Sequence, residues 1–409
     1  MISYEERTKD YAEKIAAFQV KQKQPYEFKR RYAEVRIKEF IRECAVRGLN
    51  CHVSVGGLDS ITLLMLIRSM GYTSSDIPGV SVSSLEDSSV QTVHRALGVE
   101  RLKPYKNKVD ILQEFGFPVI SKEVAAKIEL LANPTEKNKT VRHAIITGET
   151  GEYGGFRKGT RMKLADRWLK LFGGYANEEE GVDYCVPPSG VKVSSQCCYW
   201  LKEKPADDWA RANNSVPFLG LMASEGGRRQ KSLMINGCNY FGKSTTRSAP
   251  FAIFMRQDIL TLAQEMDCYY REHIDRFAKT SKLRPGEIMP ESIIPAAYGE
   301  IKRDFSGKLR TTKAQRTGCS MCGFGIHMEK RPHRFDRLRE RNPKEWDFWM
   351  NRCCKDPDGT LYGWGRVLDY IGVDWRDEVF DMENAQLSFD DIDNEEDKYD
   401  PENPDPHEL

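Results

Sequence analysis

Apolar residues recur at helical spacing through the first 48 residues, and many lysines and arginines lie between them. Pro25 is the only proline between residues 4 and 48, and Gly48 follows the last apolar turn. Because glycine commonly ends a helix, this pattern predicts a basic helical region over residues 1–48.

After Gly48 the pattern changes to short apolar runs that alternate with helical segments. The predicted strands are 51–55, 79–83 and 100–104, and the predicted helices between them are 61–68 and 89–97. Such alternation is typical of parallel βαβ units. The predicted fold class is therefore α/β, a parallel sheet flanked by helices, with ligand sites at the carboxyl ends of the strands.

A further core strand is predicted at 216–222, and beyond residue 249 helices dominate, notably over 251–270 and 329–354. The residues after 376 are of low complexity. We therefore expect four regions, namely the basic helices 1–48, a nucleotide-binding α/β domain 49–265, a helical basic region 266–376 and an acidic tail 377–409.

The composition argues against a membrane-spanning protein. The mean hydropathy of the 409 residues is -0.59. The longest apolar runs, 63–67 and 249–255, are far shorter than the about 20 residues that cross a bilayer. The first 14 residues carry no apolar core of a secretory signal. We therefore expect a cytoplasmic protein without a membrane partner.

The formal net charge of +1 conceals a segregation of charge. Residues 377–409 contain 14 Asp and Glu against one Lys, which leaves 61 basic and 47 acidic residues in 1–376. A basic body with an acidic tail suggests a polyanionic partner for the body. The alternative is that the tail only keeps the chain soluble.

The turn between the first strand and its helix has the composition of a phosphate-binding loop. Gly56 and Gly57 let a backbone approach an anion closely, and the helix that follows supplies N–H donors and positive potential. Asp59 would cap the helix or position a metal, and Ser60 would donate its hydroxyl to a phosphate oxygen. The alternative is a tight strand–helix connection without a ligand.

In its strand–helix context, the segment Val55-Gly56-Gly57-Leu58-Asp59-Ser60 resembles the PP-loop, S-G-G-x-D-S, of the ATP pyrophosphatases and of the phosphoadenosine phosphosulfate (PAPS) reductase superfamily. Four later segments, which extend the resemblance over about residues 49–345, match family features in the expected order: 83–87, 116–122, 220–229 and 316–322.

The resemblance implies a fold like that of the adenine nucleotide alpha hydrolases, with ATP or another adenine nucleotide bound together with Mg²⁺. It makes Asp59 and Ser60 the candidate catalytic residues. The candidate nucleotide-binding residues are Ser54, Gly56, Gly57, Asp59, Ser60, Glu86, Lys122, Glu225, Arg228 and Arg229.

The chain departs from the family pattern at four positions. Val55 stands where the loop begins with Ser, and Leu58 stands where Lys is frequent. Met222 replaces an Arg and Gly226 replaces a Ser. The resemblance therefore supports nucleotide binding more strongly than ATP hydrolysis. Lys122, Arg228 and Arg229 are the candidates for the missing positive charge.

Eleven cysteines without a visible secretory signal argue against a disulfide framework. Six of them are clustered, in the pairs Cys197-Cys198 and Cys353-Cys354 and in Cys319-x-x-Cys322. The set Cys197, Cys198, Cys319 and Cys322 resembles the C-C…C-x-x-C ligands of a [4Fe–4S] cluster in adenylylsulfate reductases. Zinc is the alternative, since it also accepts four thiolates. Cys353-Cys354 would replace one pair as ligand or simply pack beside Trp346 and Trp349.

Residues 313–344 combine many basic residues with aromatic ones. This composition is typical of a surface that follows a nucleic-acid backbone and stacks bases on its rings. The alternative is a solvated helix whose cations pair with Glu329, Asp336 and Glu340.

Three functions remain open from the sequence. The first is an ATP-pyrophosphatase-type enzyme that activates a substrate, with nucleic acid as a candidate, for sulfur transfer from a donor protein. The second is a sulfonucleotide reductase, which the absence of any cysteine after Cys354 opposes. The third is a non-catalytic regulator that binds a nucleotide or a nucleic acid.

Overall fold

The structure is a computed structural model of the 409-residue chain, and it describes most of the chain before residue 377. The described residues are 4–82, 86–149, 162–172, 175–177, 182–184, 191–242, 245–314, 319 and 321–376. Side chains are described for these residues except 4–9, 175–177, 182–184, 227 and 228.

The chain folds into two compact units, and the described residues of each come from two separated stretches of sequence. Among the described residues, unit 1 is drawn from 4–103 and 204–319, and unit 2 from 104–203 and 321–376. These boundaries differ from the predicted regions, since a division at 265/266 would cut the continuous helix α12 (Arg256–Glu272).

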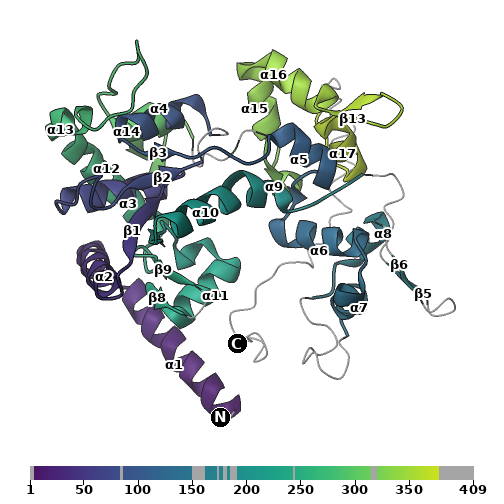
Figure 1. The fold of residues 1–409 in the computed structure, drawn as a ribbon, viewed down its shortest axis with the longest axis horizontal. Coiled ribbons are helices and arrows are strands. Elements are labelled where there is room, and N and C mark those ends of the chain that lie inside the picture. The colour runs from purple at the N-terminus through teal and green to yellow at the C-terminus, as the bar shows by residue number, and fades with distance from the viewer. Residues whose placement is uncertain are drawn as a thin grey trace. The chain divides into compact units, whose positions relative to one another are not determined.

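Unit 1 is built on a six-stranded sheet with the order β3-β2-β1-β7-β9-β8. All neighbours run parallel except β8, which is antiparallel to β9. The strands are β1 (Asn50–Ser54), β2 (Gly79–Ser81), β3 (Glu100–Arg101), β7 (Ser215–Phe218), β8 (Asn239–Phe241) and β9 (Thr246–Ser248). Strand β1 pairs with β7 from a distant part of the chain. Figure 1 accordingly shows the purple β1 beside the teal helix α10, which directly precedes β7 in the sequence. The predicted α/β class with a mostly parallel sheet is thus confirmed.

The apolar periodicity predicts most of the helices of unit 1 at about their observed positions. They are α1 (Tyr4–Gln22), α2 (Tyr26–Val46), α3 (Leu58–Ser69), α4 (Ser88–Ala96), α10 (Lys204–Ala212), α11 (Gly227–Asn236), α12, α13 (Ile274–Ala278) and α14 (Ile293–Tyr298), with the 3-10 turn η4 (Ala223–Glu225) and the hairpin β10 (Ile301–Arg303)–β11 (Leu309–Thr311). The helical region expected over 1–48 consists of α1 and α2, which are separated before Pro25 because proline has no N–H to continue the helical ladder and suits a helix start.

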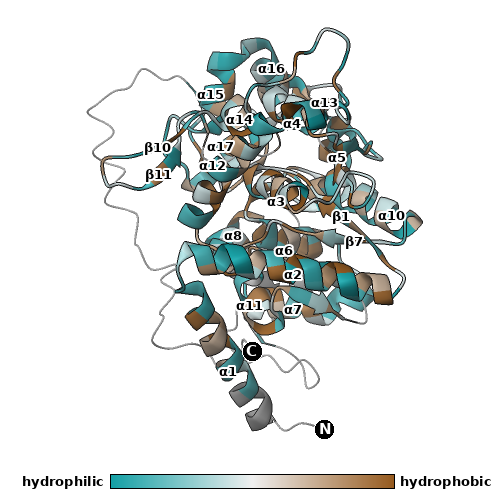
Figure 2. Ribbon diagram, turned by 90° about the vertical axis from the view of Figure 1, so that its left-hand side faces the viewer, coloured by the Kyte–Doolittle hydropathy of each residue, from teal (hydrophilic) through white to brown (hydrophobic). Residues whose placement is uncertain are grey.

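The two faces of the unit 1 sheet bury different helices. Cys51 and Val53 of β1 belong to the same core cluster as the apolar residues of α2, α3 and α12. His52 points to the other face, where its ring meets Trp209 of α10 with centroids 5.1 Å apart. Figure 2 shows α3 coloured largely brown, which agrees with its nearly complete burial, whereas α2 alternates between teal and brown.

Unit 2 is mainly helical and has its own apolar core around Phe117, Phe172, Phe335 and Trp364. Its helices are α5 (Lys108–Phe115), α6 (Lys122–Ala132), α7 (Lys139–Thr147), α8 (Asp166–Phe172), α9 (Gln196–Cys198), α15 (Arg334–Arg341), α16 (Pro343–Asp347) and α17 (Trp364–Tyr370). Shorter elements are the 3-10 helices η2 (Glu136–Asn138) and η5 (Ile326–Met328), the π-helical turns η3 (Tyr199–Glu203) and η6 (Phe348–Arg352), and the strands β4 (Val119–Ile120), β5 (Tyr175–Asn177), β6 (Val182–Tyr184), β12 (Gly323–Phe324), β13 (Cys354–Lys355) and β14 (Leu361–Tyr362).

The helix expected over 329–354 is divided into α15, α16 and η6. Asn342 caps α16 by accepting the N–H of Glu345, and Pro343 occupies its first turn. None of the helices in the described part of the chain is both long and apolar enough to cross a membrane.

Candidate functional site

The glycine turn joins the carboxyl end of β1 to the amino end of α3. Gly57 is the N-cap of α3, and it offers no side chain to accept the N–H groups of the first helical turn. Those N–H groups and the helix dipole therefore present positive potential at this turn. The local sequence makes this happen, because glycine stands where Ser, Thr, Asp or Asn would have capped the helix.

Ser60 closes the turn from within. The Gly56 N–H donates to Ser60 Oγ over 2.7 Å, and the Ser60 hydroxyl donates to the Gly57 carbonyl over 2.9 Å. Ser60 is only 9% exposed. The hydroxyl that was expected to reach a phosphate thus holds the loop in shape in this structure.

His94 also holds the same loop, through a contact with the Gly56 carbonyl. Its Nε2 lies 2.8 Å from the Gly56 carbonyl, so Nε2 carries the proton and donates it. The imidazole comes from the last turn of α4 and is 2% exposed. The sequence contains no spacing that marks His94 as part of a site, because its partner is a backbone atom 38 residues away.

Asp59 is held by an arginine that the sequence did not indicate. Arg256 Nη1 lies 3.0 Å from Asp59 Oδ1, and the two side chains are 35% and 25% exposed. Arg256 is the first residue of α12, which packs along α3. The candidate catalytic carboxylate is therefore paired with a cation at the rim of the loop.

Gly220 brings the chain after β7 against the first turn of α3. A Cβ atom at this position would lie 2.8 Å from Ser60 N, 2.9 Å from the Asp59 carbonyl carbon and 3.0 Å from Ser60 Cα. Because β1 has β2 on one side and β7 on the other, the turns after β1 and β7 meet where the strand order reverses. Such a switch point is where ligands bind in open α/β sheets.

We expect Gly220→Ala to lower the free energy of unfolding of unit 1 by about 1–3 kcal/mol, because the new methyl group meets backbone atoms that cannot rotate away. Hydrogen exchange of peptides from α3 would measure the loss. Gly56→Ala is the matched control, since its Cβ would meet nothing closer than Ser60 Oγ at 3.9 Å. Equal protection in the two variants would contradict the close approach at Gly220.

The remaining candidate nucleotide residues are distributed unevenly. Ser54 Oγ lies 3.4 Å from Nε2 of the buried His52. Glu225 of η4 pairs with Arg229 over 2.9 Å, and η4 is tied to the segment before α12 by a 3.0 Å bond from Ser224 Oγ to the Phe254 carbonyl.

Three other predicted residues have different outcomes. Glu86 is 7% exposed and directly follows residues outside the described part. The side chain of Arg228 also lies outside the described residues. Lys122 belongs to unit 2, where it pairs with Glu203. Of the candidate positive charges, Lys122 and Arg229 are thus engaged with acidic side chains.

A hollow of about 660 Å³ lies away from the glycine turn, at the opposite end of α3. It is lined by residues of α2, of α12 and of the end of α3, including Ser69 and Met70. It is open and carries charges of both signs, so its shape alone does not mark a ligand site. The loop geometry carries the functional argument instead.

The cysteine-bearing segments of unit 2 gather around α5. Helix α5 packs against α9, which carries Cys197 and Cys198, and against β13, which carries Cys354. At the start of α5, Lys108 Nζ donates to the Met321 carbonyl beside Cys322 over 2.9 Å. Cys319 belongs to unit 1.

These cysteines do not form a ready metal site in the part of the chain that is described. Within those residues, no group of three or more His, Cys, Asp or Glu side chains is arranged to hold a metal ion. The four-thiolate set Cys197, Cys198, Cys319 and Cys322 therefore stays a prediction, and no chemical step is assigned to it below.

Cys353 and Cys354 are part of the apolar core of unit 2. Each is 3% exposed, and their Sγ atoms lie 3.8 Å apart. Cys353 also donates to the Trp349 carbonyl over 3.4 Å. The hydrogen bond to Cys354, together with burial, raises the pKa of the Cys353 thiol. The packing interpretation of this pair is thus supported.

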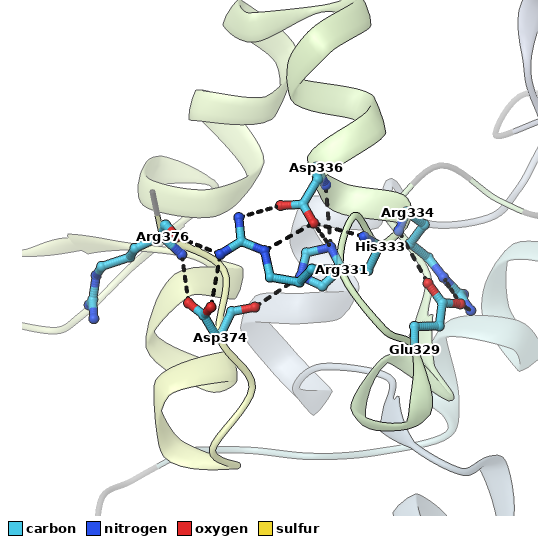
Figure 3. A network of polar contacts seen from close by, with 7 residues as sticks. All are labelled: Glu329, Arg331, His333, Arg334, Asp336, Asp374 and Arg376. Atoms are coloured by element: carbon cyan, nitrogen blue, oxygen red, sulfur yellow. Dashed lines mark hydrogen bonds and ion pairs between the residues drawn. The ribbon is translucent and has the colours of Figure 1, made fainter. Parts of the chain in front are cut away.

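Three residues of the basic stretch 313–344, namely Arg331, His333 and Arg334, pair with acidic side chains at the start of α15. Figure 3 shows Arg331 between Asp336, at 3.0 Å, and Asp374, at 2.8 Å. Arg334 pairs with Glu329. These contacts fix the N-terminus of α15 to the segment after α17, as the solvated, ion-paired interpretation of the stretch expects.

No protein-family model, no curated protein and no solved structure matches this chain.

Proposed function

We propose that unit 1 binds an adenine nucleotide with its phosphates on the loop Gly56–Ser60. The observation that carries this proposal is the uncapped start of α3 at a reversal of strand order, with the loop braced by Ser60 and His94. The brace matters because donors that are already oriented need no reorganisation when an anion arrives. A negative group at a helix N-terminus is stabilised by roughly 0.3–1 kcal/mol, and by up to about 2 kcal/mol where it is partly buried.

The identity of the nucleotide follows from the resemblance of residues 49–345 to the PP-loop proteins. We propose an ATP-pyrophosphatase-type reaction, in which an oxygen of the substrate attacks the α-phosphate and pyrophosphate leaves. A nucleophilic sulfur from a donor protein then bonds to the activated atom of the acceptor, for which nucleic acid is the candidate. The adenylated oxygen leaves as part of AMP. The loop N–H groups would stabilise the charge that develops on the phosphate.

Magnesium fits this site as a partner of the nucleotide. Mg²⁺ commonly takes one or two carboxylates together with substrate phosphates, and when bound it would neutralise phosphate charge. Asp59 is the carboxylate at the loop, and its 25% exposed side chain is accessible from solvent. Asp59 must then exchange its Arg256 contact for the cation.

Nucleotide binding without turnover is the alternative that the structure favours next. The position where the PP-loop pattern often has Lys is Leu58, which is 4% exposed in the core. The loop itself therefore supplies no positive side chain for a phosphate. Asp59 is already engaged by Arg256. A binding module would keep the loop geometry and lack ATP/pyrophosphate exchange. A sulfonucleotide reductase would instead release sulfite from PAPS with a thiol donor.

Ser60→Ala tests the proposed site. We expect it to weaken binding of a non-hydrolysable ATP analogue by about tenfold or more, because the Gly56 N–H loses its acceptor and the loop its brace. Titration calorimetry with Mg²⁺ present would measure the change. Ser69→Ala is the matched control, since its hydroxyl bonds the Leu66 carbonyl at the far end of the same helix.

Two results would overturn the proposal. Wild-type protein that gives no heat with ATP analogue, AMP or PAPS would remove the nucleotide site. Equal affinities of the Ser60→Ala and Ser69→Ala variants would place any binding elsewhere.

A further inference from the structure

A cation from outside the glycine turn reaches its rim. Arg256 lies in the first turn of α12, 197 residues after Asp59, and its Nη1 lies 3.0 Å from Asp59 Oδ1. Leu58, inside the loop, is buried and apolar. The first turn of α3 therefore has a guanidinium beside it that belongs to another helix.

The backbone that carries Arg256 is firmly anchored, so its position is a property of the fold. Lys29 of α2 pairs with Asp258 over 2.7 Å, and these side chains are 5% and 13% exposed. Asp258 also accepts the Met255 N–H over 2.7 Å. One turn of α12 is thus fixed while the Arg256 side chain remains 35% exposed.

We propose that Arg256 is a phosphate-binding residue of the nucleotide site, which exchanges Asp59 for a phosphate group when the nucleotide binds. This inference rests on the proposed function above. An ion pair whose side chains are 35% and 25% exposed is partly solvated and contributes little to stability, so breaking it costs little free energy. Phosphate accepts the planar guanidinium through two parallel hydrogen bonds, which are stronger than a single contact to a carboxylate. The exchange also releases Asp59 to face a cation that accompanies the phosphates.

Arg256→Gln is the direct test, with the full chain and a non-hydrolysable ATP analogue in titration calorimetry. We expect the affinity to fall by about 10- to 100-fold, the usual range for a lost charged hydrogen bond. Arg256→Lys should recover part of this loss, because it keeps the charge but not the fork. Arg271→Gln is the matched control, since Arg271 lies in the last turn of the same helix and pairs with Asp267.

A second variant separates phosphate binding from simple neutralisation of Asp59. If Arg256 acted only by cancelling the charge of Asp59, then Arg256→Gln combined with Asp59→Asn would restore the wild-type affinity for inorganic pyrophosphate. We expect the double variant to stay at least tenfold weaker. Restored affinity, or an Arg256→Gln variant that binds like wild type, would overturn the role of Arg256 while leaving the nucleotide site intact. Wild-type protein that binds neither ligand would overturn both.

Discussion

Lys29→Ala is expected to lower the free energy of unfolding of unit 1 by about 3 kcal/mol or more, at the lower end of the 3–5 kcal/mol range for breaking a buried ion pair. Lys29 is 4% exposed as a residue, and its ammonium lies 2.7 Å from Asp258. Removing the ammonium leaves the Asp258 carboxylate, whose side chain is 13% exposed, without its cation. The contact described above that remains to it is the Met255 N–H. Hydrogen exchange of peptides from α2 and α12 would measure the loss in unit 1 specifically.

The double variant Lys29→Met with Asp258→Leu separates two effects: the loss of the attraction between the two charges, and the cost of leaving the Asp258 carboxylate buried without its partner. Replacing both partners by apolar residues of similar volume is commonly neutral or stabilising. We therefore expect the double variant to recover most of the stability that the Lys29→Ala variant loses. Lys14→Ala is the surface control, because the pair of Lys14 with Asp10 is about half exposed and should contribute about 0–1 kcal/mol. Similar losses in the Lys29 and Lys14 variants would contradict the burial argument.

The Lys29–Asp258 pair also connects stability to the proposed site. Asp258 lies two residues after Arg256, and its carboxylate accepts the N–H of Met255, the residue immediately before Arg256. A rigid first turn of α12 sets where the Arg256 guanidinium can reach. Lys29, one of the many basic residues of the region 1–48, thus takes part in an internal contact.

Sequence periodicity predicted the first strand of the unit 1 sheet, its glycine turn and the helix after it, because these signals are local. The strand near 51–55, the glycine turn and the apolar helix after it occupy about 20 consecutive residues. Their outcome in the structure is β1, Gly56-Gly57 and α3. The helix start was predicted less well, because the sequence offered Asp59 as the cap whereas α3 begins at Leu58, with Gly57 as its N-cap and no capping side chain.

The contacts that complete the site could not be predicted in the same way. His94, Arg256 and Gly220 approach the loop across 38 to 197 positions of sequence. Each partner is a backbone atom or a single carboxylate, and such pairings leave no periodic trace. The positive charge was sought near the matching segments, at Lys122, Arg228 and Arg229, whereas the described charge at Asp59 comes from α12.

The division into units was also hidden from local patterns. The described residues of each unit come from two separated stretches, so composition changes along the chain do not coincide with the edges of the units. The π-helical turns η3 and η6 each lie next to a vicinal cysteine pair in unit 2. Extra-residue turns of this kind are frequent at functional sites, and they have no simple sequence signature.

Acidification should destabilise unit 1 through His52. Burial lowers the pKa of His52 to about 4 from the ordinary value of 6.5. Between these values the unfolded chain binds a proton at this residue and the folded chain does not, so stability falls as the pH falls. The full difference corresponds to about 3 kcal/mol, lost from about pH 6.5 downward and complete below about pH 4.

His52→Asn isolates this contribution from the carboxylates that titrate in the same range. Asparagine places a polar atom near the position of Nδ1, which lies 2.8 Å from Ser215 Oγ. Hydrogen exchange of β1 peptides between pH 7 and pH 4.5, corrected for the intrinsic rate, would give the local free energy of opening. We expect the wild type to lose about 2 kcal/mol more than the variant over this range. Parallel profiles would show that His52 is protonated in the folded strand, and β1 would then lead to the glycine turn with a charge buried against Trp209.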